Sequence, residues 1–305
     1  MRIGLFVDEK GPSLDLIVDQ ARAAATAGFS GVWLGQRDGR DALTTLAVAG
    51  RQVPGIELGT AVVPSYPRHP LALAAQALTV QEAVGGRLSL GLGVSHRHII
   101  EGQYGLSFDR PVRHLREYLS ALVPLLKGET VTYEGETLQA AGAVDIAAAA
   151  PPSVLVGALG PAMLRVAGEL ADGTITTWAN ATALADHVVP AITRAAGRRT
   201  PRVVASTVVC VTSHEDDRRN WVAENFGMVG QLPSYRAVLD QGRAAGPQDT
   251  VVIGDEVVVE RQIRRLFDAG ATELVVMLLG SEDEQARSTA LLADLAETHS
   301  KGSRS

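Results

Sequence analysis

Two histidines that could transfer protons follow a short apolar run in the first third of the chain. Residues 88–98 read LSLGLGVSHRH, so Gly91 and Gly93 lead into His96 and His98. A neutral imidazole can donate or accept a proton near pH 7. Both histidines are therefore candidates for acid–base chemistry, with a structural or exposed position as the alternative for each.

The glycines in the same run have more than one interpretation. The dinucleotide fingerprint G-x-G-x-x-G would require glycine at position 96, where this chain has His96. Glycine near a strand end often marks a close approach to the backbone. The sequence leaves open whether Gly91 and Gly93 admit a flat ring or only adjust the packing.

A second glycine turn, Val156-Gly-Ala-Leu-Gly-Pro161, joins an apolar run to a segment with proline in its first helical turn. Backbone N–H groups at such a helix start can bind phosphate. An ordinary tight turn would have the same sequence, so both interpretations remain open.

Arginines gather in segments that follow apolar runs, although the formal net charge of the chain is -6. A local positive rim would attract an anionic ligand. Solvated surface arginines are the alternative explanation for any one of them. The five arginines are Arg37, Arg40, Arg68, Arg97 and Arg110.

Short apolar runs alternate with longer segments of helical periodicity along the whole chain, which predicts repeated βα units. The predicted strands cover residues 2–7, 31–35, 57–63, 88–92, 153–156, 174–177, 203–211 and 273–279. The predicted helices cover residues 13–27, 41–51, 70–84, 111–126, 161–170, 183–196, 215–224 and 283–297. We therefore predict an α/β fold, a (β/α)₈ TIM barrel, with its active site at the carboxyl ends of the strands.

Two additions to the repeat are expected. A hairpin is predicted over Thr130–Leu138, with a Glu-Gly turn, and a helical insertion over Gln231–Ala269 precedes the last strand. No Pro/Gly/Ser-rich linker divides the chain, so we expect a single domain over residues 1–299 and a disordered polar tail over residues 300–305.

Composition limits the class of partner. The chain has 305 residues with 46% hydrophobic content and one cysteine, Cys210, which cannot form an internal disulfide. No cleavable leader is evident, and no apolar run approaches the roughly 20 residues of a membrane helix. The negative net charge argues against nucleic acid. We expect a cytoplasmic protein that binds a small molecule, not nucleic acid or a membrane.

The sequence resembles the luciferase-like flavin and deazaflavin oxidoreductases, in particular the actinobacterial members that use coenzyme F420. The resemblance runs from Arg2 to about Leu279. Its most specific parts are GTAVVPSYPRHP at 59–70, GRLSLGLGVS at 86–95, residues 152–173 and Gly254-Asp255. It implies a luciferase-like TIM barrel that holds an isoalloxazine or deazaflavin ring at the strand ends.

The resemblance also implies roles for individual residues. A non-proline cis peptide is expected at Ala61-Val62, behind the ring, and backbone N–H groups of residues 157–160 are expected to bind the cofactor phosphate. The implied cofactor-binding residues are Ala61, Val62, Gly93, Val94, Ser95, Gly157, Ala158, Leu159 and Gly160. The expected substrate contacts are Arg37 and Trp178, which follow predicted strands, and Tyr235 in the insertion.

The chain departs from several deazaflavin-dependent relatives after the second strand. Those relatives have an acidic residue followed by histidine, whereas this chain has Gln36-Arg37. The departure disfavours alcohol oxidation by a sugar-phosphate dehydrogenase of that type, which needs a base there. We predict His96 as the substitute proton donor, and Gln36 as a hydrogen-bonding group for the ring or a substrate carbonyl.

The expected function is that of an F420-dependent oxidoreductase. It would transfer hydride between C5 of the deazaflavin and a small organic substrate, by reduction of an activated C=C or C=N bond. The alternatives are an FMN-dependent luciferase-like monooxygenase, a metal-dependent hydrolase using His96 and His98, and a catalytically silent cofactor-binding protein. Relatives are often dimers, so the resemblance allows a homodimer.

Overall fold

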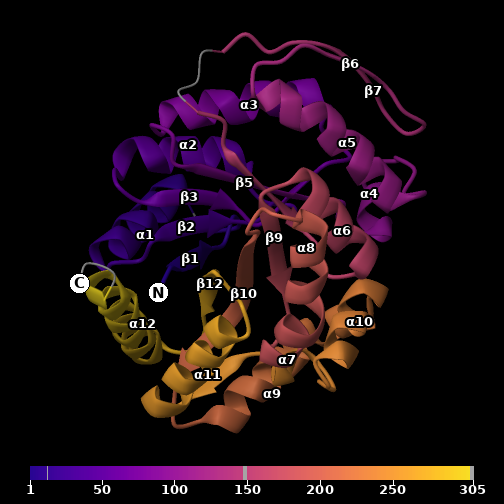
Figure 1. The fold of residues 1–305 in the computed structure, drawn as a ribbon. Helices are drawn as coiled ribbons and strands as arrows, with labels where there is room; N and C mark the ends of the chain where they lie inside the picture. The colour runs from indigo at the N-terminus through magenta and orange to yellow at the C-terminus, as the bar shows by residue number, and fades with distance from the viewer. Residues whose placement is uncertain (12, 147–149, 303–305) are drawn as a thin grey trace.

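Eight parallel strands close into a barrel in the computed structural model, which describes residues 1–11, 13–146 and 150–302. Each strand pairs with the next one around the barrel, and β1 pairs with both β2 and β12, which completes the ring (Figure 1). The strands are β1 (Ile3–Val7), β2 (Gly31–Leu34), β3 (Glu57–Thr60), β5 (Leu88–Gly93), β8 (Ser153–Gly157), β9 (Gly173–Thr177), β10 (Arg202–Val211) and β12 (Glu273–Leu278). The predicted TIM barrel is confirmed.

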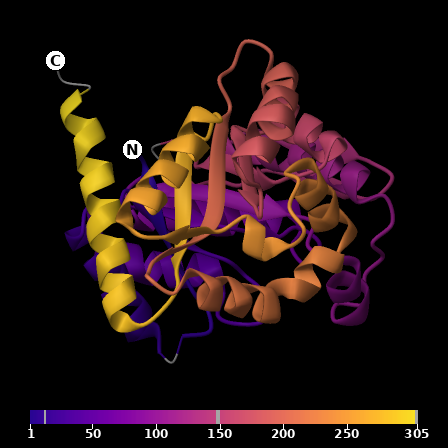
Figure 2. The same cartoon turned by 90° about the horizontal axis from the view of Figure 1, so that it is seen from below.

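Helices surround the strands (Figure 1), and α12 runs along one side of the molecule (Figure 2). Side chains at the predicted starts fix two helix ends: Ser13 Oγ accepts from the Leu16 N–H, and Asp41 Oδ1 accepts from the Thr44 N–H. The helices that follow the strands are α1 (Leu14–Thr26), α2 (Ala42–Gln52), α3 (Pro70–Ala83), α5 (Pro111–Leu126), α6 (Pro161–Leu170), α7 (Ala181–Ala183) with α8 (Val189–Ala196), α11 (Glu256–Asp268) and α12 (Glu282–Gly302).

The inside of the barrel is filled by a small apolar cluster around the buried indole of Trp33. Glycines on the neighbouring strands make room for this side chain. A Cβ at Gly4 would lie 2.6 Å from Trp33 Nε1, and one at Gly59 would overlap the indole ring. The cluster also contains Leu155, Ile175, Val204 and Val275.

Charged side chains close the amino end of the barrel, below this cluster. Arg202 donates to both oxygens of Glu273, at 2.7 and 2.9 Å, and to Glu57 Oε1 at 2.9 Å. Its third donor contacts Ser89 Oγ at 2.8 Å. Because these groups satisfy one another, this end of the barrel is closed by ion pairs.

The predicted hairpin is present but shifted along the chain. Its strands are β6 (Val131–Glu134) and β7 (Gln139–Gly142), joined by residues 135–138, and the Gly135 N–H donates to the Leu138 carbonyl at 2.8 Å. The turn therefore lies at Glu136-Thr137, and the prediction of a Glu-Gly turn is wrong in position. The buried Glu117 carboxylate on α5 explains the shift. It accepts hydrogen bonds from the N–H groups of Glu136 and Thr137 and from the Thr137 hydroxyl.

Other boundaries differ where short elements were missed. Residues 57–63 do not form one strand, because β3 ends at Thr60 and β4 (Val63–Pro64) pairs with β5. Between them lies the cis Ala61-Val62 peptide, which confirms that expectation. The loop after β5 contains α4 (Arg97–Gly102). Helix α12 includes residues 300–302 of the expected tail, and residues 303–305 lie outside the described residues.

The insertion before β12 begins earlier than predicted. We expected residues 215–224 to be the seventh barrel helix, but α9 (Glu215–Phe226) packs on the turn η2 (Gly227–Gln231) and on η3 (Pro247–Asp249). Helix α11 takes the place of the seventh barrel helix. It packs on β10, and its residues Val259, Ile263 and Leu266 are buried. The insertion also contains α10 (Pro233–Gln241) and the short strand β11 (Val252–Gly254).

We predict that Gly59→Ala destabilises the protein by roughly 1–3 kcal/mol, because the added methyl group overlaps the indole of Trp33 inside a filled barrel. Urea unfolding followed by far-UV circular dichroism measures the change. Gly102→Ala is the control, since a Cβ there meets nothing within 4 Å in helix α4. An equal loss in both variants would contradict the role given to Trp33.

Candidate active site

A cavity of about 660 Å³ opens at the carboxyl ends of the barrel strands. Every predicted site residue except Ala158 lines it. Ala158 is buried, and its carbonyl oxygen accepts a hydrogen bond from the Thr174 hydroxyl at 3.1 Å. The structure therefore gathers residues from strands far apart in the sequence, while their individual roles stay predictions.

The ends of β3, β5 and β8 form one side of the cavity, which we call the glycine side. A Cβ at Gly93 would lie 3.0 Å from Val62 Cγ2, and one at Gly157 would lie 3.4 Å from the same atom. Both glycines thus leave space beside Val62, which lines the cavity. A flat ring could lie against this side.

Gly91 and Gly93 differ in their surroundings, so the structure answers the question left open by the sequence for Gly91 only. A Cβ at Gly91 would overlap the carbonyl oxygen of Thr60. The Thr60 hydroxyl donates to the Gly91 carbonyl at 2.7 Å and accepts from the Gly91 N–H at 2.8 Å. Gly91 therefore serves packing between β3 and β5, and Gly93 borders the cavity.

The first turn of α6 adjoins the glycine side. Gly160 is its N-cap and Pro161 its first residue, and no side chain caps this helix. Gly160, Ala162 and Met163 also line the cavity. The N–H groups of a first helical turn have no intrahelical acceptor, so those of Ala162 and Met163 could bind an anionic oxygen.

His96 lies where α4 begins, between the glycine side and the insertion. Its ring is 5.8 Å from that of His98 and 5.4 Å from that of Tyr235 on α10. Burial lowers the pKa of His96, and the nearby His98 adds to that shift. Burial also raises the pKa of Tyr235. Each shift favours the uncharged form of its ring.

Two residues of the cavity have a left-handed backbone that non-glycine residues seldom adopt. Ser95 after β5 and Trp178 after β9 both have φ of 60°. Each such conformation costs of order 1–3 kcal/mol and often occurs at a functional site. Their position at two strand ends of one cavity supports the choice of this cavity as the active site.

The arginines around the cavity are engaged by other groups. Arg68 binds Asp41, Arg97 binds Glu101, and Arg110 binds Glu136. Arg40 donates to the carbonyl oxygens of Glu9 and Gly11. These four arginines therefore each have a carboxylate or carbonyl partner, and the alternative of a free positive rim gains no support.

Gln36 and Arg37 line the cavity, and other residues of the protein also hydrogen-bond to both side chains. Arg37 Nε and Nη2 contact the fully buried Glu9 carboxylate at 2.8 and 3.1 Å, and this hydrogen bonding raises the pKa of Arg37. Gln36 Oε1 accepts from Arg68 Nη2 at 3.0 Å and from the Ala42 N–H at 3.1 Å. The amide nitrogen of Gln36 is the end left to contact a ligand.

Sequence reasoning missed an apolar part of the lining. Phe226 and Val229 come from the end of α9 and from η2, and Met277 comes from β12. Met277 lies near the carboxyl end of β12, so the strand-end rule was a usable signal for it. Nothing comparable indicates Phe226 or Val229, because the insertion does not follow the βα repeat.

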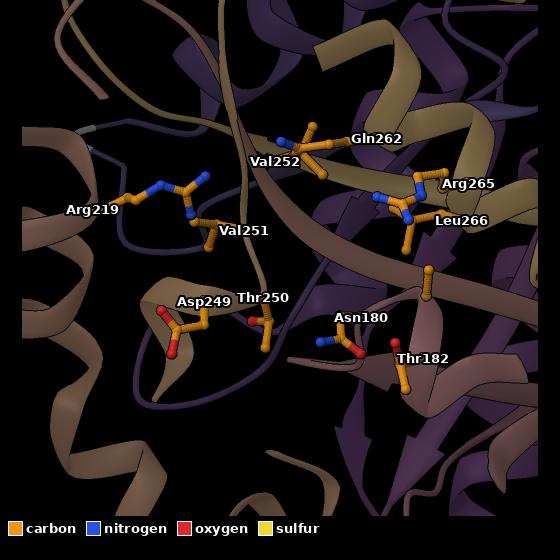
Figure 3. Close-up of a pocket in the computed structure, with 11 residues that line it drawn as sticks. Asn180, Thr182, Arg219, Asp249, Thr250, Val251, Val252, Gln262, Arg265 and Leu266 are labelled. Carbon is orange, nitrogen blue, oxygen red and sulfur yellow. The ribbon is translucent and has the colours of Figure 1, made fainter. Parts of the chain in front are cut away.

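A second cavity, of about 260 Å³, lies between α7, α11 and residues 249–252 (Figure 3). It contains none of the predicted site residues. Arg219 at its edge donates to the carbonyl oxygens of Gln248 and Ile253, at 2.8 and 3.3 Å. This arginine therefore ties η3 to β11.

The described residues can be searched for a metal site and for a membrane-spanning helix. Within residues 1–11, 13–146 and 150–302, no group of three or more His, Cys, Asp or Glu side chains is placed to hold a metal ion. In the same ranges, no helix is long and apolar enough to cross a membrane. The metal-dependent hydrolase therefore gains no support from the site.

The closed barrel, with a cavity at its strand ends, defines a TIM-barrel protein. Residues 1–296 match the model of the luciferase-like monooxygenase family, and the chain belongs to that family.

Two curated relatives each match about half of the chain, and one of them is named for coenzyme F420. The chain is 33% identical over 160 residues to a 5,10-methylenetetrahydromethanopterin reductase of Methanolobus tindarius, covering 52% of this chain and 49% of the relative. It is 35% identical over 165 residues to a putative coenzyme F420-dependent oxidoreductase of Mycobacterium tuberculosis, covering 50% and 48%. The chain therefore spans about half the length of both relatives.

The fold is also similar to that of a coenzyme F420-dependent tetrahydromethanopterin reductase from Methanopyrus kandleri. The TM-score is 0.77 with 21% identity, covering 98% of this chain and 99% of the other. At this identity the similarity establishes the fold alone.

We predict that Arg37→Met destabilises the protein by roughly 2–4 kcal/mol, because it leaves the buried Glu9 carboxylate without its main partner. Chemical unfolding at pH 7 measures the change. Arg97→Met is the control, since its ion pair with Glu101 is exposed and is worth less than about 1 kcal/mol. Similar losses in both variants would show that Arg37 is not a structural residue.

Proposed function

We propose that the protein is a deazaflavin-dependent oxidoreductase that uses coenzyme F420 to reduce an activated C=C or C=N bond in a small organic substrate. The observation that carries the proposal is the glycine side, where Gly93 and Gly157 leave a flat space beside Val62 next to the uncapped start of α6. The F420-dependent relatives support the choice of cofactor.

The residues present fit such a cofactor. Gly93 and Gly157 have no side chains to obstruct a ring, and a Cβ at Gly160 would meet nothing within 4 Å. The ring would lie against Val62, and the N–H groups of residues 157–160, together with those of Ala162 and Met163, would bind the phosphate. When bound, the reduced deazaflavin supplies a hydride from C5.

The protein's own groups would supply and place the proton. Addition of a hydride to one atom of the C=C or C=N bond requires a proton at the other atom, while the cofactor is oxidised by two electrons. Protonated His96 is the proton donor in this proposal. The amide nitrogen of Gln36 can donate a hydrogen bond to a substrate carbonyl, because its oxygen is already engaged.

An FMN-dependent monooxygenase is the second candidate, because the family also includes FMN-dependent members. The glycine side and the start of α6 would suit either ring. The tail of F420 carries several glutamates, which unpaired arginines would attract. Because Arg68, Arg97 and Arg110 already bind carboxylates of the protein, they do not favour F420 over FMN. The preference for F420 therefore rests on the relatives. A silent cofactor-binding protein would have the same site without turnover.

Fluorescence titration of the purified protein with oxidised F420 and, separately, with FMN tests the cofactor proposal. We expect a dissociation constant for F420 in the micromolar range or below, and at least tenfold weaker binding of FMN. A preference for FMN would support the monooxygenase, and binding of neither would overturn both candidates.

We predict that His96→Gln lowers kcat about 10²–10⁴-fold with little change in cofactor affinity, because glutamine can donate a hydrogen bond but cannot transfer a proton. Since the pKa of His96 is lowered, its protonated fraction rises as the pH falls below 7. The wild-type kcat should therefore increase from pH 7 toward pH 5.5, and that of the variant should not.

His98→Gln is the matched control, because His98 lines the same cavity and its ring stacks beside that of His96. Its kcat should stay within about threefold of wild type. An unchanged kcat in His96→Gln would rule out His96 as the proton donor.

A further inference from the structure

We propose that the cavity accepts an uncharged, largely apolar substrate, bound against an apolar wall formed by Trp178, Phe226, Val229, Leu232 and Met277. The inference rests on the proposed function for the position of the cofactor, which would occupy the glycine side. The substrate class itself follows from the charges and the packing of the remaining lining.

The apolar wall and the glycine side belong to different arcs of the barrel. Around the closed ring, β3, β5 and β8 are consecutive, and β9, β10, β12, β1 and β2 complete the circle. Trp178 follows β9, Met277 lies on β12, and the other three wall residues come from the insertion after β10. A ligand between the two arcs would contact the glycine side with one face and the apolar wall with another.

The wall is held in place from behind. Trp178 is 8% exposed, and its ring lies 5.1 Å from that of Phe226. Both pack on a separate apolar cluster that includes Val208, Leu239 and Ile253. Because β10, α10 and β11 all contribute to that cluster, packing from three elements fixes the position of the wall.

No permanent charge without a partner faces the space between the two arcs, and burial favours the neutral form of His96, which lines the cavity with His98. Among the described residues that line the cavity there is no Asp, Glu or Lys, and Arg37 is the one arginine. Its guanidinium binds Glu9 and Asp8. The polar groups on the substrate side are uncharged, and they include Gln36, Thr177, Ser206 and Ser234.

This lining discriminates by charge. An ionic substrate would lose its hydration on entering the cavity and would find no opposite charge there, which is unfavourable. An uncharged carbonyl, amide or ester would lose less hydration free energy than an ion. It could hydrogen-bond to the amide of Gln36 or to the hydroxyl groups that line the cavity. Its apolar part would gain by contact with the wall.

Matched amides and carboxylates test the charge preference, because each pair has nearly the same shape and differs by one negative charge. Cinnamamide with cinnamate and 2-naphthamide with 2-naphthoate would be titrated calorimetrically at pH 7.5 into the protein, with oxidised F420 present and absent. We expect the amides to bind at least tenfold more tightly than the carboxylates. Equal or tighter binding of the carboxylates would overturn the proposal, as would no binding of either amide.

A paired charge insertion tests the location. Val229→Arg places a cation in the wall, and we expect it to shift the amide-to-carboxylate affinity ratio at least tenfold toward the carboxylate. Met228→Arg is the control, because Met228 is the next residue, is 72% exposed and does not line the cavity. Its ratio should stay within twofold of wild type. Equal shifts in both variants would indicate a general surface effect and overturn the placement.

Phe226→Ala separates the wall from the cofactor site. We expect it to weaken amide binding about tenfold and to leave the dissociation constant of F420 within twofold of wild type. An equal loss of both would contradict the division into two arcs. If F420 does not bind to the wild-type protein but the amide preference persists, the proposed function fails while this inference stands.

Discussion

The packing of Trp33 against glycine on the neighbouring strands is the constraint on which the rest of the barrel depends. The indole occupies space that side chains at positions 4 and 59 would otherwise fill. It forms the apolar interior with Ile175 and Val275, and partly buried Phe6 and Val62 pack on this cluster. Phe6, Val62 and Ile175 also line the cavity. The floor of the active site is therefore the upper surface of the same cluster that fills the barrel.

The repeat could be predicted from sequence because each βα unit carries local signals. Ser13 and Asp41 cap their helices as their positions suggest, and Pro111 and Pro161 begin theirs. The errors arise where a distant group decides the local structure. Glu117 on α5 fixes the position of the hairpin turn, and Glu9 after β1 engages Arg37 after β2. Neither pairing is visible in a local window of sequence.

The candidate site was predictable to a similar extent. The strand-end rule and the resemblance identified the glycine side, since Val62, Gly93 and Gly157 lie within recognisable stretches. They did not identify the apolar wall, because Phe226 and Val229 belong to an insertion outside the repeat. The sequence also could not separate Gly91 from Gly93, because one packs on Thr60 and the other borders the cavity only in three dimensions.

The division between repeat and insertion has a consequence for specificity. Residues of the glycine side lie at strand ends whose positions are fixed by barrel closure, so substitutions there disturb both the fold and the proposed cofactor site. Phe226, Val229 and Leu232 lie at the end of α9, on η2 and between η2 and α10, and these elements share an apolar cluster with β10 without forming part of the ring. Changes at Phe226, Val229 or Leu232 can therefore alter which substrate fits while leaving Trp33 and its glycines undisturbed. A barrel built in this way can keep the proposed cofactor site and change the wall that would face the substrate.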